Sequence, residues 1–181
     1  MKKVLALLLV VAMVAALFVG CTNTTTPAET EGMKVAMITD YGDITDESFN
    51  QATYEGAQEW CNANSVDFTY YKPTGDSTAE RVAAIDQAVA DGYNVLLMPG
   101  YAFAGAIVES IDKYPEVKYV ALDVGEYDLQ DAAGTVDDWS YVYPDNLYSA
   151  VDQDLAAGQT ETEDFIRHRE VVSDVVNVLL S

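Results

Sequence analysis

Short apolar runs alternate with longer segments of helical periodicity over residues 33–123. The short runs have the length and the β-branched or aromatic content of strands, and they are residues 35–38, 66–71, 94–98 and 117–122. The longer segments place apolar side chains on one helical face, and they are residues 48–62, 77–91 and 103–114. This alternation predicts an α/β fold with a doubly wound parallel sheet.

Local signals support two of these helices. Ser77 and Glu80 fit a capping box at the start of the second helix, and Gly92 follows its last turn. In the first helix Cys61 lies beside the apolar face, so we predict a buried structural thiol there.

The ends of the predicted strands carry polar residues and glycine. In a parallel sheet all carboxyl ends lie on one edge, which would bring together Asp40, Lys72, Gly100 and Asp123. Open α/β sheets bind their ligands at this edge. We therefore expect a ligand site at this rim of the sheet.

The chain is organised around residues 34–50, which join the first strand to the first helix. Asp40 ends the strand, and Phe49 and Asn50 begin the helical pattern. A carboxylate, an aromatic ring and an amide so close together suggest a site for a planar, hydroxylated ligand. The alternative is an ordinary strand–helix connection, in which Phe49 packs in the core and Asp46 caps the helix.

Beyond Asp123 the pattern is weaker. Residues 125–138 read as a loop, residues 146–151 as a fifth strand and residues 163–181 as a helix. The apolar side of this last segment consists of Phe165, Val172, Val176 and Leu179. Its final residues are almost entirely apolar, which is typical of a segment that packs against another surface.

The amino-terminal residues have the pattern of a bacterial lipoprotein leader. Lys2 and Lys3 precede an apolar run at residues 4–19, and Gly20 precedes Cys21. We predict a signal peptide at residues 1–20, lipid attachment to Cys21 and a polar, Thr-rich tether at residues 21–32. The alternative is an uncleaved membrane anchor with a chance cysteine.

Composition narrows the chemistry. The formal charge of −21 repels nucleic-acid phosphates, so we expect no nucleic-acid partner. His168 is the only histidine, which excludes a multi-histidine metal site and disfavours a Ser-His-Asp triad. Two cysteines do not make a disulfide framework. We predict no metal and no cofactor.

Several short motifs follow one another in a fixed order along the chain. They are Thr39-Asp40, Asp46-Glu47-Ser48-Phe49-Asn50-Gln51 with Glu55-Gly56, Asp91-Gly92-Tyr93, Met98-Pro99-Gly100-Tyr101, and Tyr114-Pro115-Glu116-Val117-Lys118-Tyr119-Val120 leading into Asp123. Together they resemble the basic membrane protein family, whose members are substrate-binding lipoproteins of ABC transporters and include bacterial purine nucleoside receptors. The match covers residues 33–123, with a fainter echo at 146–158, and the order of its motifs makes it specific.

This resemblance implies a type I periplasmic-binding-protein-like fold, in which two α/β lobes close on the ligand and residues 33–158 form the first lobe. It implies a lipid-anchored protein on the extracytoplasmic face of a bacterial membrane. Such a protein binds a nucleoside, above all a purine nucleoside, and delivers it to the permease of an ABC transporter without enzymatic activity.

The ligand-binding residues that the resemblance implies are Asp40, Phe49, Asn50, Gly100, Tyr101 and Asp123. Phe49 would stack on the purine and Asn50 would bond its edge. Asp40 and Asp123 would accept hydrogen bonds from the base or the ribose hydroxyls.

Family members are nearly twice as long, and the second lobe is missing here. Residues 159–181 match no pattern of the family, so we predict a truncated product with a divergent helical tail. Two alternatives remain: a remnant that binds nothing tightly, and a Mg²⁺-dependent enzyme that uses Asp40 and Asp123. The sequence has no Gly-rich phosphate loop or Walker lysine, which disfavours the enzyme.

Overall fold

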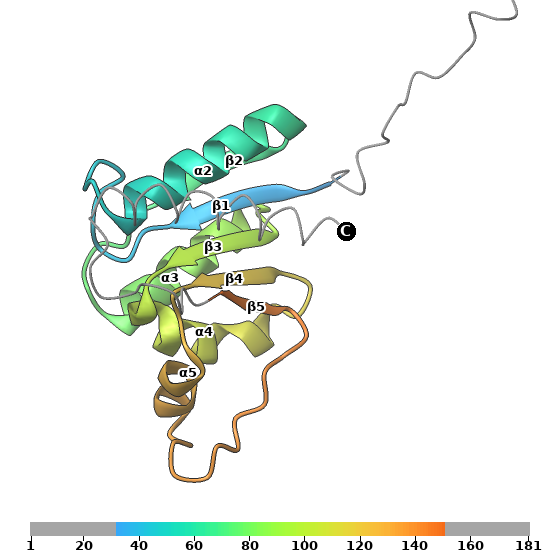
Figure 1. Ribbon diagram of the computed structural model, residues 1–181. Coiled ribbons are helices and arrows are strands. Elements are labelled where there is room, and N and C mark those ends of the chain that lie inside the picture. Colours follow the sequence, from blue (N-terminus) through green and yellow to red (C-terminus); the bar gives the residue numbers. More distant parts are fainter. Residues whose placement is uncertain (1–31, 151–181) are drawn as a thin grey trace, which may run out of the picture.

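The computed structural model describes residues 32–150, which form a parallel β-sheet with helices on both faces (Figure 1). The strands are β1 (Lys34–Ile38), β2 (Asp67–Tyr71), β3 (Val95–Pro99), β4 (Lys118–Leu122) and β5 (Leu147–Ala150). The helices are α2 (Phe49–Asn64), α3 (Thr78–Ala90), α4 (Ala104–Ser110) and α5 (Glu126–Ala133), with short 3₁₀ turns η1 (Tyr101–Phe103) and η2 (Ile111–Lys113) around α4. The predicted α/β class and parallel sheet are confirmed.

The order of the strands is β2-β1-β3-β4-β5, and all neighbours run parallel. Val35 of β1 therefore lies between Phe68 of β2 and Val95 of β3. The chain first moves from β1 to β2 and then crosses to the opposite side of β1 to form β3. This reversal between β1 and β3 is the switch point at which open α/β sheets bind ligands.

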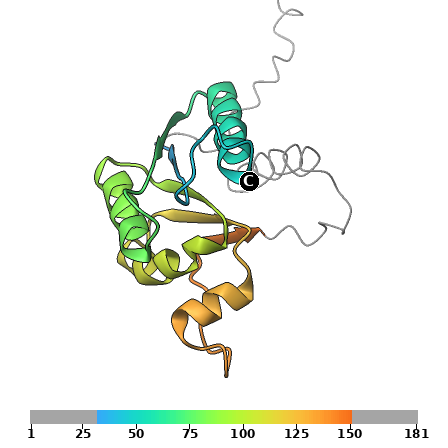
Figure 2. The same ribbon diagram turned by 90° about the vertical axis from the view of Figure 1, so that its left-hand side faces the viewer.

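One face of the sheet packs against α3, α4 and α5 (Figure 2). Ile85 of α3, Ile107 of α4 and Leu129 of α5 are fully buried there, together with Phe103 and Tyr119. Because α3 contacts α4 and α4 contacts α5, the three helices form a continuous layer over this face. That layer fixes the carboxyl ends of β1, β3 and β4 relative to one another.

The opposite face packs against α2, whose contacts are mainly with β2, β1 and β3. Trp60 and Cys61 of α2 are buried against Val35 and Met37 of β1. Cys61 is a free, buried cysteine, as predicted from the helical pattern. Ser65 ends α2 in a left-handed conformation, and its N–H donates to carbonyls of the last helical turn.

The start of α3 has the capping box that the sequence predicts. The hydroxyl of Ser77 accepts a hydrogen bond from the backbone N–H of Glu80 at 3.3 Å, and the Glu80 carboxylate accepts from the backbone N–H of Ser77 at 3.2 Å. Two of the N–H groups that a helix start leaves without partners are satisfied in this way.

The structure corrects one boundary. Residues 126–133 form the helix α5, although the sequence analysis assigned 125–138 to a loop. The Asp128 carboxylate accepts from the N–H of Gly125 at 2.7 Å and so closes the first turn, while Leu129 and Gln130 are buried. With so few apolar positions, this short helix shows no clear periodicity. The predicted fifth strand is confirmed at Leu147–Ala150.

Within residues 32–150 no helix is long and apolar enough to cross a membrane. The predicted leader, Cys21 and tether, and the predicted helix at 163–181, lie outside the described residues.

Candidate functional site at the carboxyl rim of the sheet

The sheet brings the predicted site residues to one rim. Asp40 follows β1, Gly100 and Tyr101 follow β3, and Asp123 follows β4. The ladder bonds extend to these positions, because the N–H of Gly100 donates to the carbonyl of Leu122 at 2.7 Å. Asp40 and Gly100 therefore flank the switch point between β1 and β3.

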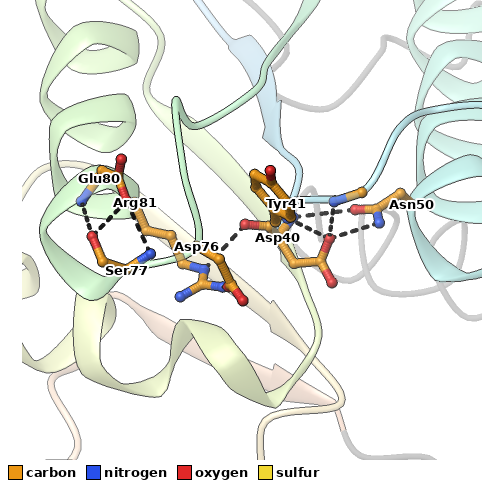
Figure 3. A network of polar contacts seen from close by, with 8 residues as sticks. Asp40, Tyr41, Asn50, Asp76, Ser77, Glu80 and Arg81 are labelled. Atoms are coloured by element: carbon orange, nitrogen blue, oxygen red, sulfur yellow. Dashed lines mark hydrogen bonds and ion pairs between the residues drawn. The ribbon is translucent and has the colours of Figure 1, made fainter.

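The Asp40 carboxylate is held by one of its oxygens (Figure 3). Oδ1 accepts hydrogen bonds from the backbone N–H groups of Tyr41 and Gly42, the latter at 2.7 Å, and from the Asn50 amide at 2.8 Å. None of the hydrogen bonds among residues 32–150 uses Oδ2. The carboxylate thus has one oxygen committed to the loop and one that remains as an acceptor.

Asn50 is the centre of this loop and is only 4% exposed. Its Oδ1 accepts from the backbone N–H of Asp40 at 3.2 Å, and its Nδ2 donates to Asp40 Oδ1 and to Asp46 Oδ2, both at 2.8 Å. Both amide protons are therefore used within the loop. The predicted bond from Asn50 to a ligand stays a prediction, and in this arrangement its amide positions Asp40.

Asp46 lies at the entry to α2, where the alternative interpretation of the sequence placed it as a cap of the helix. Its Oδ1 accepts from the backbone N–H groups of Ser48 and Gln51 in the entry to α2, at 2.9 and 3.2 Å. A carboxylate at this end of a helix is favoured by the free N–H groups and by the helix dipole. Asp46 thus ties the start of α2 to the Asn50 amide.

Arg81 is a component that the sequence analysis missed. Arg81 is 5% exposed, its Nε donates to the backbone carbonyl of Asp40 at 3.2 Å, and its guanidinium pairs with Asp76. The guanidinium also lies 5.8 Å from the centre of the Phe103 ring. The sequence does contain a signal for the role of Arg81. An arginine occupies the buried stripe of α3, which otherwise consists of Ala84, Ile85 and Ala88.

The electrostatics of the loop favour an ionised Asp40. Partial burial raises the pKa of this carboxyl, but the N–H groups of Gly42 and Tyr41 lower it, as do the Asn50 amide and the Arg81 charge. The net result is a pKa below the ordinary value of aspartate. The stability that these bonds give is present above the pKa of the unfolded chain and is lost as pH falls through the folded value.

The other half of the rim is more open. Tyr101 is 71% exposed, and Gly100 has φ of 103° and ψ of 147°, a conformation that is essentially restricted to glycine. Asp123 has φ of 57°, in the left-handed region, and its N–H donates to the carbonyl of Ala150 at 2.7 Å. The Asp123 side chain is partly exposed at the end of β4.

Phe49 is the first residue of α2 and is partly buried, whereas Ala52, Ala57 and Trp60 on the same helix are buried in the core. The predicted stacking of the Phe49 ring on a ligand therefore stays a prediction. Among the described residues no group of three or more His, Cys, Asp or Glu side chains is arranged to hold a metal ion.

Comparison with known proteins places this fold in a family. The family described as PnrA-like ABC transporter substrate-binding proteins, Bmp, matches residues 33–151. An uncharacterized lipoprotein of Pyrococcus horikoshii is 32% identical over 128 residues, which are 68% of this chain and 31% of that protein. The nucleoside-binding ABC transporter protein BmpA of Lactococcus lactis is 26% identical over 131 residues, 67% of this chain and 36% of that protein. The match thus spans about a third of the length of these relatives.

Solved structures support the fold. A solute-binding protein of an Aeropyrum pernix ABC transporter system matches with a TM-score of 0.52 and 22% identity, over 66% of this chain and 28% of that one. A lipoprotein fragment of Peptoclostridium difficile 630 matches with a TM-score of 0.51 and 17% identity, over 80% of this chain and 98% of that one. On the sequence match over residues 33–151, the chain belongs to the Bmp family of PnrA-like ABC transporter substrate-binding proteins.

Proposed function

We propose that residues 33–158 form a nucleoside-binding lobe and that the rim around Asp40 is its ligand site. The observation that carries this proposal is the Asp40 carboxylate, whose Oδ1 is fixed by three N–H donors while Oδ2 remains an acceptor beside the switch point. A pre-fixed acceptor loses little freedom on binding, and nucleosides present hydroxyl and ring N–H donors to it.

The remaining residues supply complementary contacts in this proposal. Phe49 stacks on the base from the start of α2, and Asp123 accepts a second hydrogen bond from the end of β4. Gly100 and Tyr101 border the ligand between these two acids. Asn50 acts mainly by holding Asp40, and its own bond to the base requires a rearrangement of the loop.

The affinity of residues 33–158, taken as a lobe by themselves, is expected to be low. One lobe leaves the ligand open to water on its other side, so each hydrogen bond contributes little net free energy. We expect a dissociation constant near millimolar, about −4 kcal/mol. Binding without turnover separates the proposal from a Mg²⁺-dependent enzyme that uses Asp40 and Asp123, and from a remnant that binds nothing.

A two-dimensional NMR titration of the full chain in mild detergent tests the proposal, with adenosine, guanosine and inosine up to about 10 mM. The amide signals of Tyr41 and Gly42 should shift on saturation. Asp40→Asn keeps one oxygen for the N–H donors of the loop and puts an amide nitrogen, which donates, in the place of Oδ2. The variant should therefore bind the nucleoside about tenfold more weakly, or by 1.4 kcal/mol. Asp43→Asn is the control, because Asp43 lies exposed on the same loop as Asp40 and pairs with Lys72, which follows β2.

Three results would count against the proposal. An absence of any shift at the highest nucleoside concentration would support the remnant. Equal weakening by the Asp40 and Asp43 variants would indicate a nonspecific effect of charge. Nucleoside turnover that depends on Mg²⁺ would establish the enzyme instead.

The ring of Phe49 provides a separate test of the same site. Phe49→Ala should weaken nucleoside binding by about 1–3 kcal/mol if the ring stacks on the base, and Phe49→Tyr should weaken it much less. A Phe49→Ala protein that melts far earlier but binds equally well when folded would show that the ring belongs to the core.

The proposed setting of the lobe is the extracytoplasmic face of a bacterial membrane, with lipid on Cys21 and the permease of an ABC transporter as partner. Two or more acyl chains on one cysteine are enough for stable attachment to a membrane. Cys21→Ala should therefore leave an uncleaved precursor that incorporates no labelled palmitate. Normal processing and release of this variant would contradict the lipoprotein assignment.

A further inference from the structure

α5 and the loop that follows it project from the sheet as an arm. Both views show α5 and the loop after it, coloured orange, extending below the rest of the lobe (Figures 1 and 2). We call residues 126–145 the α5 arm. Leu129, which is 1% exposed, attaches the arm to the core that α4 also covers. One side of the arm thus holds it to the lobe.

Large apolar side chains are exposed along this arm. Tyr127 is 59% exposed, Trp139 49%, Val142 81% and Tyr143 38%. The Tyr143 hydroxyl donates to the carbonyl of Glu126 at 3.5 Å, which places Tyr143 at the start of α5, next to Tyr127. Exposed apolar side chains that gather on one part of a folded protein indicate a contact surface.

The arm holds these side chains in a fixed arrangement. The buried Gln130 amide accepts from the backbone N–H of Tyr141 and donates to its carbonyl, both at 3.1 Å. The Thr135 hydroxyl donates to the same amide oxygen at 2.6 Å. These bonds fasten the loop along α5 before any partner arrives, which lowers the entropic cost of binding.

Trp139 is exposed in spite of its backbone conformation. Its φ of 52° lies in the left-handed region, which is unfavourable for a bulky aromatic residue. Its N–H donates to the carbonyl of Thr135 at 2.7 Å, and this turn directs the chain back along α5. Because half of the side chain meets water, packing within the lobe offsets little of the strain. Tryptophan is among the residues that contribute most at protein interfaces.

The charge of the arm narrows the choice of partner. The arm contains no Lys or Arg, and the four ion pairs found among residues 32–150 all lie within residues 34–113. Its acids are Glu126, Asp128, Asp131, Asp137, Asp138 and Asp145. A second copy of the chain would present the same negative charge, and anionic lipid headgroups would also be repelled. A basic partner is attracted, and its cations can stack on Tyr and Trp rings.

We propose that the α5 arm is a docking surface for a basic segment of a partner protein that carries both cationic and apolar side chains. The apolar side chains of this segment pack on Trp139, Val142 and Tyr143, and its Lys or Arg side chains pair with the surrounding acids. The proposal does not depend on nucleoside binding at the rim.

Fluorescence anisotropy of a labelled short peptide that mixes Arg and Leu tests the proposal. The full chain is held in phosphatidylcholine nanodiscs, which keeps detergent away from the exposed rings, and empty discs give the background. Two matched peptides carry Glu in place of Arg or Ser in place of Leu. Each should bind at least about tenfold more weakly than the Arg–Leu peptide, whose binding should also weaken with salt.

Trp139→Gly separates docking from a structural role. Glycine relieves the left-handed backbone, so the melting temperature should stay the same or rise, while the Arg–Leu peptide should bind about tenfold more weakly. A lower melting temperature with unchanged peptide affinity would assign the ring to the fold and overturn the proposal.

A charge-matched pair of double variants tests the acids. Asp137→Asn with Asp138→Asn should weaken binding of the Arg–Leu peptide about threefold or more. Asp43→Asn with Asp67→Asn removes the same charge from exposed positions outside the arm and should change the affinity less than about twofold. Equal weakening by the two double variants would indicate a general effect of net charge and overturn the proposal.

The remaining outcomes also overturn it. These include equal binding of the three peptides and binding of none. Dimerisation of the full chain that Trp139→Gly abolishes would assign the surface to a second copy. Trp60 and Trp139 are the only tryptophans, so the emission of wild type minus that of Trp139→Gly reports Trp139. Blue-shifted Trp139 emission in nanodiscs before peptide is added would assign the surface to the membrane.

Discussion

At the end of β1 the carboxylate of Asp40 is fixed by backbone and side-chain donors, whereas at the ends of β3 and β4 the polar groups are partly exposed on unusual backbone conformations. The buried side chains of Asn50 and Arg81 hold the rim at the end of β1 in place. Gly100 and Asp123 in the second half both have positive φ.

The difference separates two ways of preparing a ligand site. The β1 half obtains its geometry from hydrogen bonds that are complete before a ligand arrives, which lowers the entropic cost of binding. The β3–β4 half obtains it from backbone conformations that turn the chain sharply after each strand. Substitutions in the first half should therefore cost stability, and substitutions in the second should affect binding more than folding.

The largest effect is expected for Asn50→Asp, which keeps the size of the side chain but places a carboxylate 2.8 Å from acceptors on Asp40 and Asp46. Burial of an unpaired charge among acids should lower the free energy of unfolding by about 3–5 kcal/mol at neutral pH. Chemical denaturation would measure this loss.

The pH dependence of the stability lost in Asn50→Asp identifies the buried charge as its cause. Asp40 and Asp46 would raise the folded pKa of the new carboxyl, so the part of the deficit that comes from its charge should be absent below the unfolded value of about 4 and grow as pH rises toward the folded value. Asn50→Ala is the control, since its deficit should lack this rise. A pH-independent loss in Asn50→Asp would contradict the arrangement of the three side chains.

Gly42→Ala should have the next largest effect. A Cβ at this position would lie 2.5 Å from the Asn50 amide nitrogen and 3.2 Å from Asp40 Oδ1. The amide must move and lose hydrogen bonds, so we expect a loss of about 1–3 kcal/mol in the free energy of unfolding. Thermal denaturation would detect it, and an unchanged melting temperature would show that the loop is looser than its bonds suggest.

Gly100→Ala should cost less, and for a different reason. A Cβ there would meet no atom within 4 Å, so the substitution creates no clash, but φ of 103° is strained for alanine. We expect a loss of about 1 kcal/mol or slightly more, and weaker nucleoside binding if the turn shifts. Denaturation and NMR titration on one sample would compare the effects on stability and on nucleoside binding. A loss of stability equal to that of Gly42→Ala would remove the distinction between the β1 half and the β3–β4 half of the rim.

The smallest effect on folding is expected for Asp123→Gly. Glycine relieves the left-handed conformation at φ of 57°, so the free energy of unfolding should change by less than about 1 kcal/mol. Nucleoside binding should nevertheless fall if Asp123 is the second acceptor. Unchanged binding in this variant would remove Asp123 from the site.

The sequence was sufficient for the parallel sheet because β1, β3 and β4 are mainly apolar runs, each followed by a polar or flexible residue at the same rim, and β2 alternates in residues that favour strands. The run at residues 94–98 corresponds to β3, which is buried throughout. The capping box of α3 was also readable, since Ser77 and Glu80 act within one turn. Such features depend on neighbours in the sequence.

Features that depend on distant contacts were not readable. Asn50 was assigned to the ligand because its type and position fit a site, but its hydrogen bonds to Asp40 form only when the loop folds back. Arg81 reaches a carbonyl forty-one residues earlier in the chain. Short-range periodicity carries no information on either contact, and it also missed α5, which is held by one side-chain cap and two buried residues.

The buried thiol of Cys61 has a chemical consequence. Burial, followed by the nearby negative charge of Asp67, raises the pKa of this thiol to about 12, so almost no thiolate exists at neutral pH. Alkylating reagents and oxidants attack the thiolate, and the side chain should react only when α2 separates from the sheet. The rate at which iodoacetamide modifies Cys61 would therefore report how often this layer of the native protein opens, without any introduced label.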